Sequence, residues 1–273
     1  MGTLYLVATP IGNLEDITLR ALRVLKEVSL IAAEDTRSTG LLKTRFEIDT
    51  PVTSYFEANK LAKLSFVLDA LSNGDVALIS DAGMPGLSDP GYELVRAAIR
   101  EGYLVVPVPG ASAPVTALVV SGLPTDRVGY LGFLPRRPSD RRRVLRDNAQ
   151  ERRTLVFFET PHRLRDCLAD IESIMGERAI AVCRELTKLY EEVLRGNVSE
   201  ILEHFAEVKP RGEFTIVLGG AAAEERWPEE RVREALDTLL SQGVARTTAA
   251  KQVASQSGWR RREVYDLGLS CLC

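Results

Sequence analysis

The chain has 273 residues, of which 45% are hydrophobic and 27% charged, and its formal net charge is −3. These proportions are typical of a folded globular protein of about two domains and exclude a disordered or collagen-like chain. No run approaches about 18 apolar residues, and the first residues show no basic segment or cleavage site, so we expect neither a membrane span nor a secretory signal. We therefore expect a soluble cytoplasmic protein. Its four cysteines have no paired spacing and are expected to be reduced thiols, at Cys167, Cys183, Cys271 and Cys273.

Short apolar runs alternate with helical patterns through the first half of the chain. The runs are residues 3–8, 30–33, 76–79 and 104–108. Apolar residues at helical spacing predict helices over 19–28 and 60–72. Asp89 followed by Pro90 is typical of the start of a third helix, which we expect to end near Gly102. Strands that alternate with helices predict an α/β fold with a largely parallel sheet.

The second half repeats this alternation less regularly. Its predicted strands cover residues 130–133, 154–158, 179–183 and 214–218, and its predicted helices cover 139–151, 160–175 and 198–207. Beyond Gly219 the pattern is purely helical, with three short helices and a glycine turn that resemble a helix-turn-helix unit. This tail is a packing appendage, a dimer clasp or an RNA contact made by Arg260–Arg262. We place the domains at residues 1–122, 123–222 and 223–273.

Charge is unevenly distributed along the chain. Residues 1–120 carry more acidic than basic side chains, whereas residues 127–153 carry nine arginines and only three acidic side chains. A basic block inside an acidic chain indicates a polyanion-binding surface, although a solvated helix face would look the same. Arginine rather than lysine favours bidentate contact with phosphate.

Four polar loops follow four of the predicted strands. They are residues 9–13, 81–85, 109–113 and 159–163. Ligands of open α/β sheets bind beyond the carboxyl ends of the strands, so these loops together form the candidate site. The chain lacks the glycine fingerprints of NAD(P) and ATP sites, which leaves a ligand held by backbone groups and a carboxylate, with Asp81 a partner for ribose hydroxyls.

Metal and covalent chemistry have little support in the sequence. There are only two histidines, and no metal-ligand spacing or nucleophile elbow is present, so we expect no metal. His204 lies in a polar helical stretch and is expected at the surface. His162 begins a predicted helix beside the candidate site, and a role in the site and a purely structural role stay equally open.

Nine segments, in chain order, resemble the bacterial small-subunit ribosomal RNA 2′-O-ribose methyltransferase family I. They are Thr9–Asn13, Ala32–Arg37, Ser80–Gly83, Asp89–Gly91, Gly122–Arg127, Gly132–Pro135, Thr160–Arg163, Arg184–Lys188 and Gly212–Glu213. The resemblance implies a class III, tetrapyrrole-methylase-like enzyme with two α/β domains, a small C-terminal helical domain and S-adenosylmethionine in the cleft between the α/β domains. It also implies a homodimer that methylates the ribose 2′-hydroxyl of a decoding-centre cytidine in 16S ribosomal RNA.

The chain departs from the family pattern at three places. Residues 54–59 lack the histidines that relatives often carry there, so no histidine in this stretch can act as a base. Met84 stands where many relatives have threonine, and Ala111 replaces a common proline. We expect cofactor contacts made by the backbone to survive both loop changes.

The resemblance also assigns site residues. The cofactor is expected to contact Pro10, Asp81, Gly83, Met84, Ser112, Ala113, Phe158, Leu186, Phe214 and Thr215. RNA is expected along Arg136, Arg137, Arg141, Arg142, Arg143, Arg146 and Arg163. Because they lie next to predicted strand ends, our candidate proton acceptors are Glu159, His162 and Asp35 in that order, with Lys188 as a charge stabiliser. Alignment contributes about 7–11 kcal/mol and a base only roughly 3–5.5 kcal/mol, so we expect loops to define the site.

Three alternatives stay open. A C-methyltransferase acting on a tetrapyrrole or corrinoid precursor shares the fold, but a small macrocycle does not need an extended basic surface. A non-catalytic RNA-interaction protein would bind the cofactor without transferring the methyl group. A structural ribosome-assembly factor would bind no cofactor.

Overall fold

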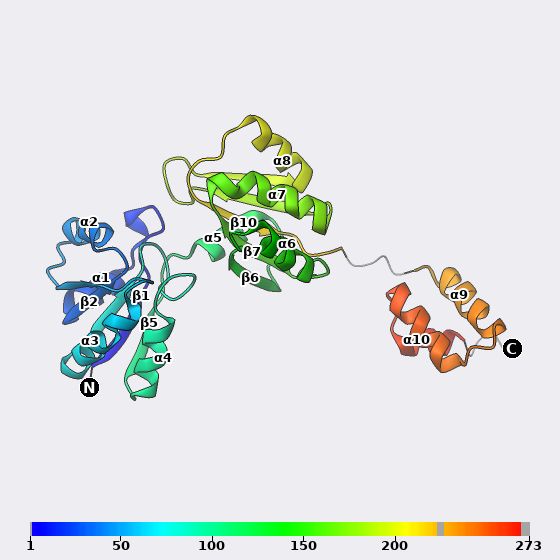
Figure 1. Ribbon diagram of the computed structural model, residues 1–273, viewed down its shortest axis with the longest axis horizontal. Coiled ribbons are helices and arrows are strands. Elements are labelled where there is room, and N and C mark those ends of the chain that lie inside the picture. Colours follow the sequence, from blue (N-terminus) through cyan, green and yellow to red (C-terminus); the bar gives the residue numbers. More distant parts are fainter. Residues whose placement is uncertain (1, 223–226, 269–273) are drawn as a thin grey trace. The chain divides into compact units, whose positions relative to one another are not determined.

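A computed structural model of the chain describes residues 2–222 and 227–268 (Figure 1). The chain divides into two compact units, residues 1–219 and residues 220–273. The first unit contains two five-stranded sheets, one on each side of residue 122 in the sequence. The division of the first unit at 122/123 and the exact limits of the C-terminal domain stay predictions. Cys271 and Cys273 lie outside the described residues.

The first sheet is parallel throughout, as the alternating pattern predicted. Its order is β3-β2-β4-β1-β5, and every neighbouring pair runs in the same direction. The strands are β1 (Thr3–Val7), β2 (Leu30–Ala33), β3 (Val52–Ser54), β4 (Val76–Ile79) and β5 (Leu104–Val108). The central strand β4 is buried along its whole length, which explains its uninterrupted apolar sequence. All five strands present their carboxyl ends at one edge of the sheet.

Helices cover both faces of this sheet. Helices α1 (Leu19–Glu27) and α2 (Thr36–Phe46) pack on one face, and α3 (Lys60–Asn73) and α4 (Tyr92–Arg100) pack on the other. The apolar stripe of α1 explains its position, because Ala21, Val24 and Leu25 are buried while its other side is exposed. Thr18 begins this helix by accepting a hydrogen bond from the backbone N–H of Ala21. A short 3₁₀ helix, η1 (Leu14–Asp16), precedes it.

The second sheet is mixed. Its order is β6-β7-β10-β8-β9; β6 and β7 are parallel and the other neighbours antiparallel. The strands are β6 (Val128–Phe133), β7 (Thr154–Glu159), β8 (Ala179–Arg184), β9 (Glu192–Asn197) and β10 (Phe214–Leu218). Helices α6 (Pro138–Asp147), α7 (Pro161–Met175) and α8 (Val198–Glu207) share one core with the sheet. Helix α5 (Ala113–Ser121) packs on the opposite face.

The second unit is helical where it is described. It contains α9 (Glu229–Ser241), α10 (Arg246–Ser257) and α11 (Arg261–Leu267). The three helices surround a small core that includes Val232, Leu236, Val253 and Val264. The turn between α10 and α11 is Gly258, whose φ of 68° favours glycine. A helical tail with a glycine turn was therefore correctly predicted.

Several local predictions need correction. The sequence pattern did not predict β3, α2 or β9, which are short or carry polar residues along much of their length. Asp89 does not cap α4: the helix begins at Tyr92, and Gly91 occupies the N-cap position. Asp89 and Pro90 instead belong to the loop that precedes the helix. No helix within residues 2–222 and 227–268 is long and apolar enough to cross a membrane.

Candidate functional site

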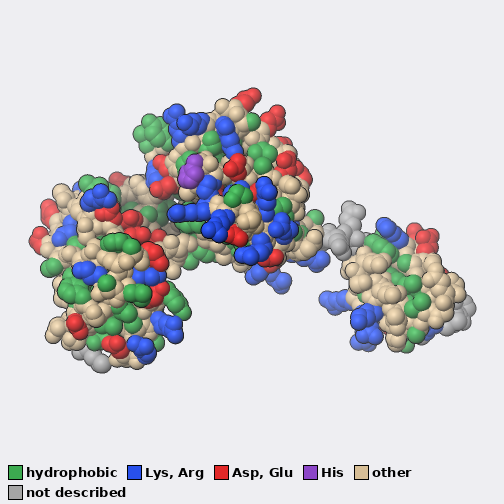
Figure 2. All heavy atoms as spheres, in the orientation of Figure 1, with side chains coloured by type: hydrophobic (Ala, Val, Ile, Leu, Met, Phe, Trp, Pro, Cys, Tyr) green, Lys and Arg blue, Asp and Glu red, His purple; other side chains and the backbone are tan. Residues whose placement is uncertain are grey.

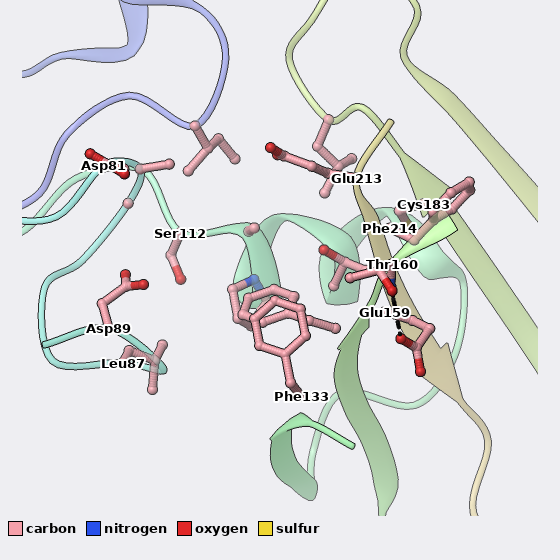
Figure 3. Close-up of a pocket in the computed structure, with 18 of the residues that line it drawn as sticks. Asp81, Leu87, Asp89, Ser112, Phe133, Glu159, Thr160, Cys183, Glu213 and Phe214 are labelled. Carbon is pink, nitrogen blue, oxygen red and sulfur yellow. Dashed lines mark hydrogen bonds between the residues drawn. The ribbon is translucent and has the colours of Figure 1, made fainter. Parts of the chain in front are cut away.

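A cavity of about 320 Å³ is lined by loops of the first sheet, the start of α5 and the ends of strands of the second sheet (Figure 3). In the close-up, Asp81 and Asp89 lie on the side of the first-sheet loops, and Phe133 and Thr160 lie on the side of the second sheet. The volume is in the range of small-molecule sites, about 300–1,000 Å³. The carboxyl edge of a parallel sheet is where such folds bind ligands.

Most residues expected to contact the cofactor line this one cavity. Nine of the ten do so: Asp81, Gly83, Met84, Ser112, Ala113, Phe158, Leu186, Phe214 and Thr215. The tenth, Pro10, lines a second cavity that adjoins the first. The structure thus brings these residues together, and their contact with a cofactor stays a prediction.

The loop after β4 is held in place by the loop after β1. Backbone hydrogen bonds join Thr9 and Gly83 in both directions, at 2.9 and 3.0 Å. The hydroxyl of Thr9 also donates to the carbonyl of Ser80 at 3.1 Å. Gly83 has a φ of 78°, a conformation that side chains with a Cβ rarely adopt. This glycine therefore explains how the chain turns directly from a buried strand into the cavity wall.

The loop between β8 and β9 carries local backbone strain. Glu185 and Thr187 have positive φ values of 50° and 65°, and Leu186 between them lines the cavity. Such conformations cost about 1–3 kcal/mol each and persist only where surrounding contacts impose them. Here Lys188 Nζ forms ion pairs with Glu185 and Glu213, both at 2.9 Å. These ion pairs hold Leu186 against the cavity.

Three carboxylates gather on the first-sheet side of the cavity. Glu34, Asp81 and Asp89 all line it. Burial raises the pKa of Asp89 to about 6, and the nearby charges of Glu34 and Asp81 add to the shift. Burial also raises the pKa of Glu34. This side of the cavity therefore concentrates acidic groups and suits a ligand that carries positive charge.

Glu159, the first candidate base, is held on both carboxylate oxygens. Its side chain is completely buried; Oε1 accepts from the backbone N–H of Thr160 at 2.8 Å, and Oε2 pairs with Arg163 at 3.1 Å. Arg163 Nη2 also donates to the carbonyls of Leu134 and Pro135, at 2.7 and 3.1 Å. The pair therefore joins the loop after β6 to the loop after β7.

This arrangement corrects the assignment of Arg163 to RNA binding. The Arg163 side chain is only 13% exposed, and its Nη2 donates to Glu159 and to two carbonyl groups, which leaves little of the side chain for contact with RNA. Glu159 is among the residues that line the cavity, but its buried carboxylate is held by Arg163 and by the backbone N–H of Thr160. The geometry favours a positioning role for Glu159 over proton transfer.

The other three catalytic candidates lie outside the first cavity. His162 is exposed, and its Nε2 lies 3.4 Å from the Thr160 hydroxyl. Asp35 is the N-cap of α2, and hydrogen bonds from Arg37 lower the pKa of its carboxyl, which makes it a weaker base. Lys188 lines the second cavity. A catalytic role for each of them stays a prediction.

The arginines predicted to bind RNA differ in their exposure to solvent. Arg141 is 3% exposed and pairs with the buried Asp170 at 2.6 Å, so its assignment to RNA binding is wrong. Arg142 donates to the same carboxylate at 2.7 Å but remains 54% exposed. Four further members of the block are exposed: Arg136, Arg137, Arg143 and Arg146. Figure 2 shows basic side chains gathered over the region of α6.

Sequence reasoning missed several residues that line the cavity. Among them are Glu34, Asp89, Phe133 and Glu213. All four lie in segments that carried the family resemblance, and that signal could have identified them. Cys183 was read only as a reduced thiol; it lines the cavity, and burial raises its pKa to about 11. Within the described residues, no group of three or more His, Cys, Asp or Glu side chains is arranged to hold a metal ion.

The sequence matches known proteins over most of its length. Residues 3–202 match the family model described as Tetrapyrrole (Corrin/Porphyrin) Methylases. A protein of Halalkalibacterium halodurans named Ribosomal RNA small subunit methyltransferase I is 48% identical over 97% of this chain and 94% of its own. Proteins of the same name are 46% identical in Synechocystis, over 98% of both chains, and 50% identical in Thermotoga maritima, over 81% of this chain and 99% of its own.

Solved structures share the fold. The uroporphyrin-III-C-methyltransferase of Thermus thermophilus superposes with a TM-score of 0.55 and 23% identity, over 81% of this chain and 96% of its own. A diphthine synthase superposes with a TM-score of 0.62 and 16% identity, over 80% of this chain and 90% of its own. At these identities the likeness concerns the architecture of the first unit and carries no statement about substrate.

Proposed function

Because the chain belongs to the ribosomal RNA small subunit methyltransferase I family, within the tetrapyrrole methylases, we propose that it methylates small-subunit ribosomal RNA. The methyl donor is S-adenosylmethionine. Within that RNA, the proposed methylation site is the ribose 2′-hydroxyl of a cytidine in the decoding centre of 16S ribosomal RNA, as the nine family-like segments imply. The enzyme would act in the cytoplasm, where its RNA substrate is found.

The observation that carries this proposal is the chemistry of the first cavity. S-adenosylmethionine, when bound, supplies an electrophilic methyl group on a positively charged sulfur. Glu34, Asp81 and Asp89 would face that positive charge, and Phe133 and Phe158 provide apolar wall. The Ser112 hydroxyl and the backbone around Gly83 add polar groups for orientation. The residues present therefore fit the cofactor in charge, polarity and available volume.

The position of α6 supports a polyanionic substrate. Phe133 lines the cavity, and α6 begins five residues later at Pro138. The buried contact of Arg141 with Asp170 fixes α6 against α7, so the exposed arginines stand on a rigid element. Arg163 joins the start of this segment to the cavity wall through the carbonyls of Leu134 and Pro135. RNA held on these arginines would therefore lie beside the cofactor cavity.

The direct test is transfer of a labelled methyl group. Purified protein is incubated with tritiated S-adenosylmethionine and either small ribosomal subunits, free 16S RNA or a tetrapyrrole precursor. We expect label in the ribosomal RNA, and mass spectrometry of the digested nucleosides should locate it on the ribose of a cytidine. Label on a nucleobase would contradict the 2′-O assignment. Label on the tetrapyrrole alone would establish the C-methyltransferase alternative instead.

A second copy of the chain is the proposed partner besides RNA. Helix α5 is apolar along its length, yet Val115 and Val119, which share one face, are 59% and 67% exposed. A face of this kind suits the surface of a homodimer. Sedimentation of the wild type and of a Val119→Lys variant tests this assignment: we expect a dimer and a monomer, respectively.

A further inference from the structure

A second cavity of about 390 Å³ adjoins the cofactor cavity. The two share the side chains of Ile11, Asp81, Ala82 and Glu213 as common wall. The remainder of the second cavity comes from the loop after β1, from α2, from the end of β4 and from Lys188. Its volume is again within the range of small-molecule sites, about 300–1,000 Å³. The first cavity contains most of the predicted cofactor contacts, so the second has no ligand assigned to it.

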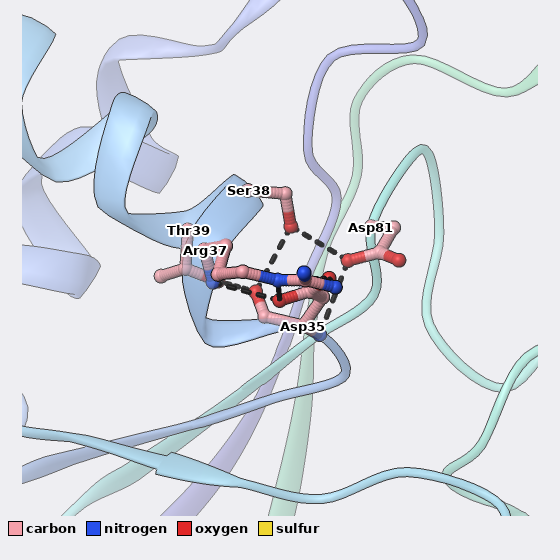
Figure 4. A network of polar contacts seen from close by, with 5 residues as sticks. All are labelled: Asp35, Arg37, Ser38, Thr39 and Asp81. Atoms are coloured by element: carbon pink, nitrogen blue, oxygen red, sulfur yellow. Dashed lines mark hydrogen bonds and ion pairs between the residues drawn. The ribbon is translucent and has the colours of Figure 1, made fainter.

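Asp81 is oriented on the wall between the two cavities. Its Oδ1 accepts hydrogen bonds from the Ser38 hydroxyl at 2.7 Å and from the backbone N–H of Asp35 at 3.1 Å (Figure 4). Both donors belong to the start of α2, which lines the second cavity. Both of these bonds end on Oδ1. The second oxygen of the carboxylate, Oδ2, accepts no hydrogen bond from the described residues. A carboxylate fixed on one oxygen and open on the other is arranged to accept a proton.

The other carboxylates near the two cavities are less suited to this role. Glu213, which also lines both, is 79% exposed and pairs with Lys188 at 2.9 Å. Glu159 is engaged on both oxygens, and Asp35 pairs with Arg37. Glu34 and Asp89 line the first cavity and are not among the residues that line the second. Asp81 combines a place on the shared wall with one oxygen fixed by two hydrogen bonds and a second that accepts none from the described residues, whereas Glu213 is held only by the ion pair of its Oε2 with Lys188.

We propose that the acceptor ribose binds in this second cavity and that Asp81 Oδ2 accepts the proton of its 2′-hydroxyl. This inference rests on the proposed function and names the acceptor site and the base of that reaction. As the bond between the ribose oxygen and the methyl carbon forms, the bond between sulfur and that carbon breaks, and its electron pair remains on sulfur. The hydroxyl proton passes to Asp81, and the products are a 2′-O-methyl ribose and S-adenosylhomocysteine.

The first test replaces Asp81 by asparagine, which keeps its size and removes its ability to take the proton. We expect the single-turnover rate of Asp81→Asn to fall about 10²- to 10⁴-fold, the usual contribution of a general base. The affinity for S-adenosylmethionine, measured by calorimetry, should fall far less than the rate, because Glu34 and Asp89 also line the cofactor cavity. Asp49→Asn, an exposed aspartate in the loop before β3, is the matched control and should retain both values. An unchanged rate for Asp81→Asn would overturn the proposal, and so would a loss of cofactor affinity as large as the loss of rate, because Asp81 would then act only as a cofactor contact.

The second test blocks the proposed acceptor site. Leu41 lines the second cavity, is absent from the lining of the first and is 73% exposed, so Leu41→Trp should fill space without disturbing the core. We expect Leu41→Trp to bind S-adenosylmethionine as the wild type does and to raise the KM for ribosomal RNA at least about tenfold, about 1.4 kcal/mol. Leu104→Trp, at the opposite end of the first sheet and 63% exposed, is the control and should have no effect.

The outcomes separate this inference from the function on which it rests. Wild-type-like kinetics of Leu41→Trp would show that the ribose enters elsewhere, and would overturn the inference while leaving the methyltransferase assignment intact. A wild-type protein that binds S-adenosylmethionine but labels no ribosomal RNA would overturn the proposed function, and the inference with it.

Discussion

The two regions that meet at the first cavity have opposite charge. The loops of the first sheet contribute Glu34, Asp81 and Asp89, whereas the segment after the first strand of the second sheet continues into the arginines of α6. A negative wall suits a cationic methyl donor, and a positive surface suits the phosphates of RNA. The net charge of −3 therefore conceals an acidic cavity wall and a basic helix surface in one chain. A charged residue type does not by itself predict exposure, since Arg141 and Arg143 lie two residues apart and only Arg143 is exposed.

The largest expected effect concerns the stability that depends on Arg141, the buried arginine of α6, and its partner Asp170. Replacing Asp170 by alanine would leave Arg141 as an unpaired buried charge. We expect this change to lower the free energy of unfolding by about 3–5 kcal/mol, measured by urea denaturation. Asp140→Ala, which removes the exposed partner of Arg143 at 3.8 Å, is the control and should cost less than about 1 kcal/mol. Similar losses for both variants would show that Arg141 is not structurally distinct from its neighbours.

The next effect concerns RNA affinity and the exposed arginines in and just before α6. A quadruple variant with alanine at Arg136, Arg137, Arg143 and Arg146 should bind RNA more weakly, and its affinity should depend less on salt. Each lost phosphate contact lowers the slope of log affinity against log salt by about 0.7–0.9, so four contacts change it by about 3. Filter binding over a range of salt concentrations measures both quantities. Arg23→Ala, an exposed arginine on α1, should leave the slope unchanged. An unchanged slope in the quadruple variant would place the RNA surface elsewhere.

The smallest expected effect concerns the three carboxylates of the first cavity and the dependence of cofactor binding on pH. Burial raises the pKa of Asp89 to about 6, so this carboxyl loses its negative charge as the pH falls through 6. Glu34 and Asp81 are the other carboxylates facing the same ligand. We expect the wild type to bind S-adenosylmethionine about fivefold more weakly at pH 5 than at pH 7, and Asp89→Asn to lose part of this dependence. Calorimetry at the two pH values provides the measurement, and identical profiles for the two proteins would exclude a role for Asp89.

The same shift has a consequence for stability. The pKa of Asp89 is higher in the folded chain than the value of about 3.9 for an exposed aspartate, so the folded state binds more protons between about pH 4 and pH 6. The contribution of Asp89 to stability therefore falls as the pH rises through this window and is constant above it. Asp89→Asn should flatten this part of the stability profile, which urea denaturation at pH 4, 5, 6 and 7 measures.

The regular elements of the fold were largely predictable from the sequence, because burial imposes a pattern on them. The strand at residues 76–79 is buried along its length, and the helix at 198–207 was predicted with its exact limits. Helix α2 was missed because its sequence, TRSTGLLKTRF, is mostly polar and has no wide apolar stripe. The strand β3 has only three residues, too few to show the alternation of apolar and polar side chains that identifies a strand. These elements depend on pairing and packing with distant parts of the chain.

Individual side chains of the site were harder to predict than the site itself. The loops after the strands were identified, but the ion pair between Glu159 and Arg163 was not. Arg163 also needs the carbonyls of Leu134 and Pro135, which lie 29 and 28 residues earlier in the chain. The same holds for Arg141, whose partner Asp170 lies 29 residues further along the chain. Asp81 was assigned to the cofactor, and only the fold shows that it borders two cavities.

The amino-acid sequence by itself determined the class of fold, the loops that line the first cavity and the family of the protein, because periodicity, glycine and proline positions and motif order are local properties. The tertiary structure alone decided which arginines are exposed, which carboxylates are engaged and where a second cavity opens. Burial and hydrogen bonding depend on residues that are far apart in the sequence and meet only when the two sheets and their helices have packed. The chemistry of a charged side chain therefore depends on its neighbours in space, and the residue type alone does not predict which neighbours it has.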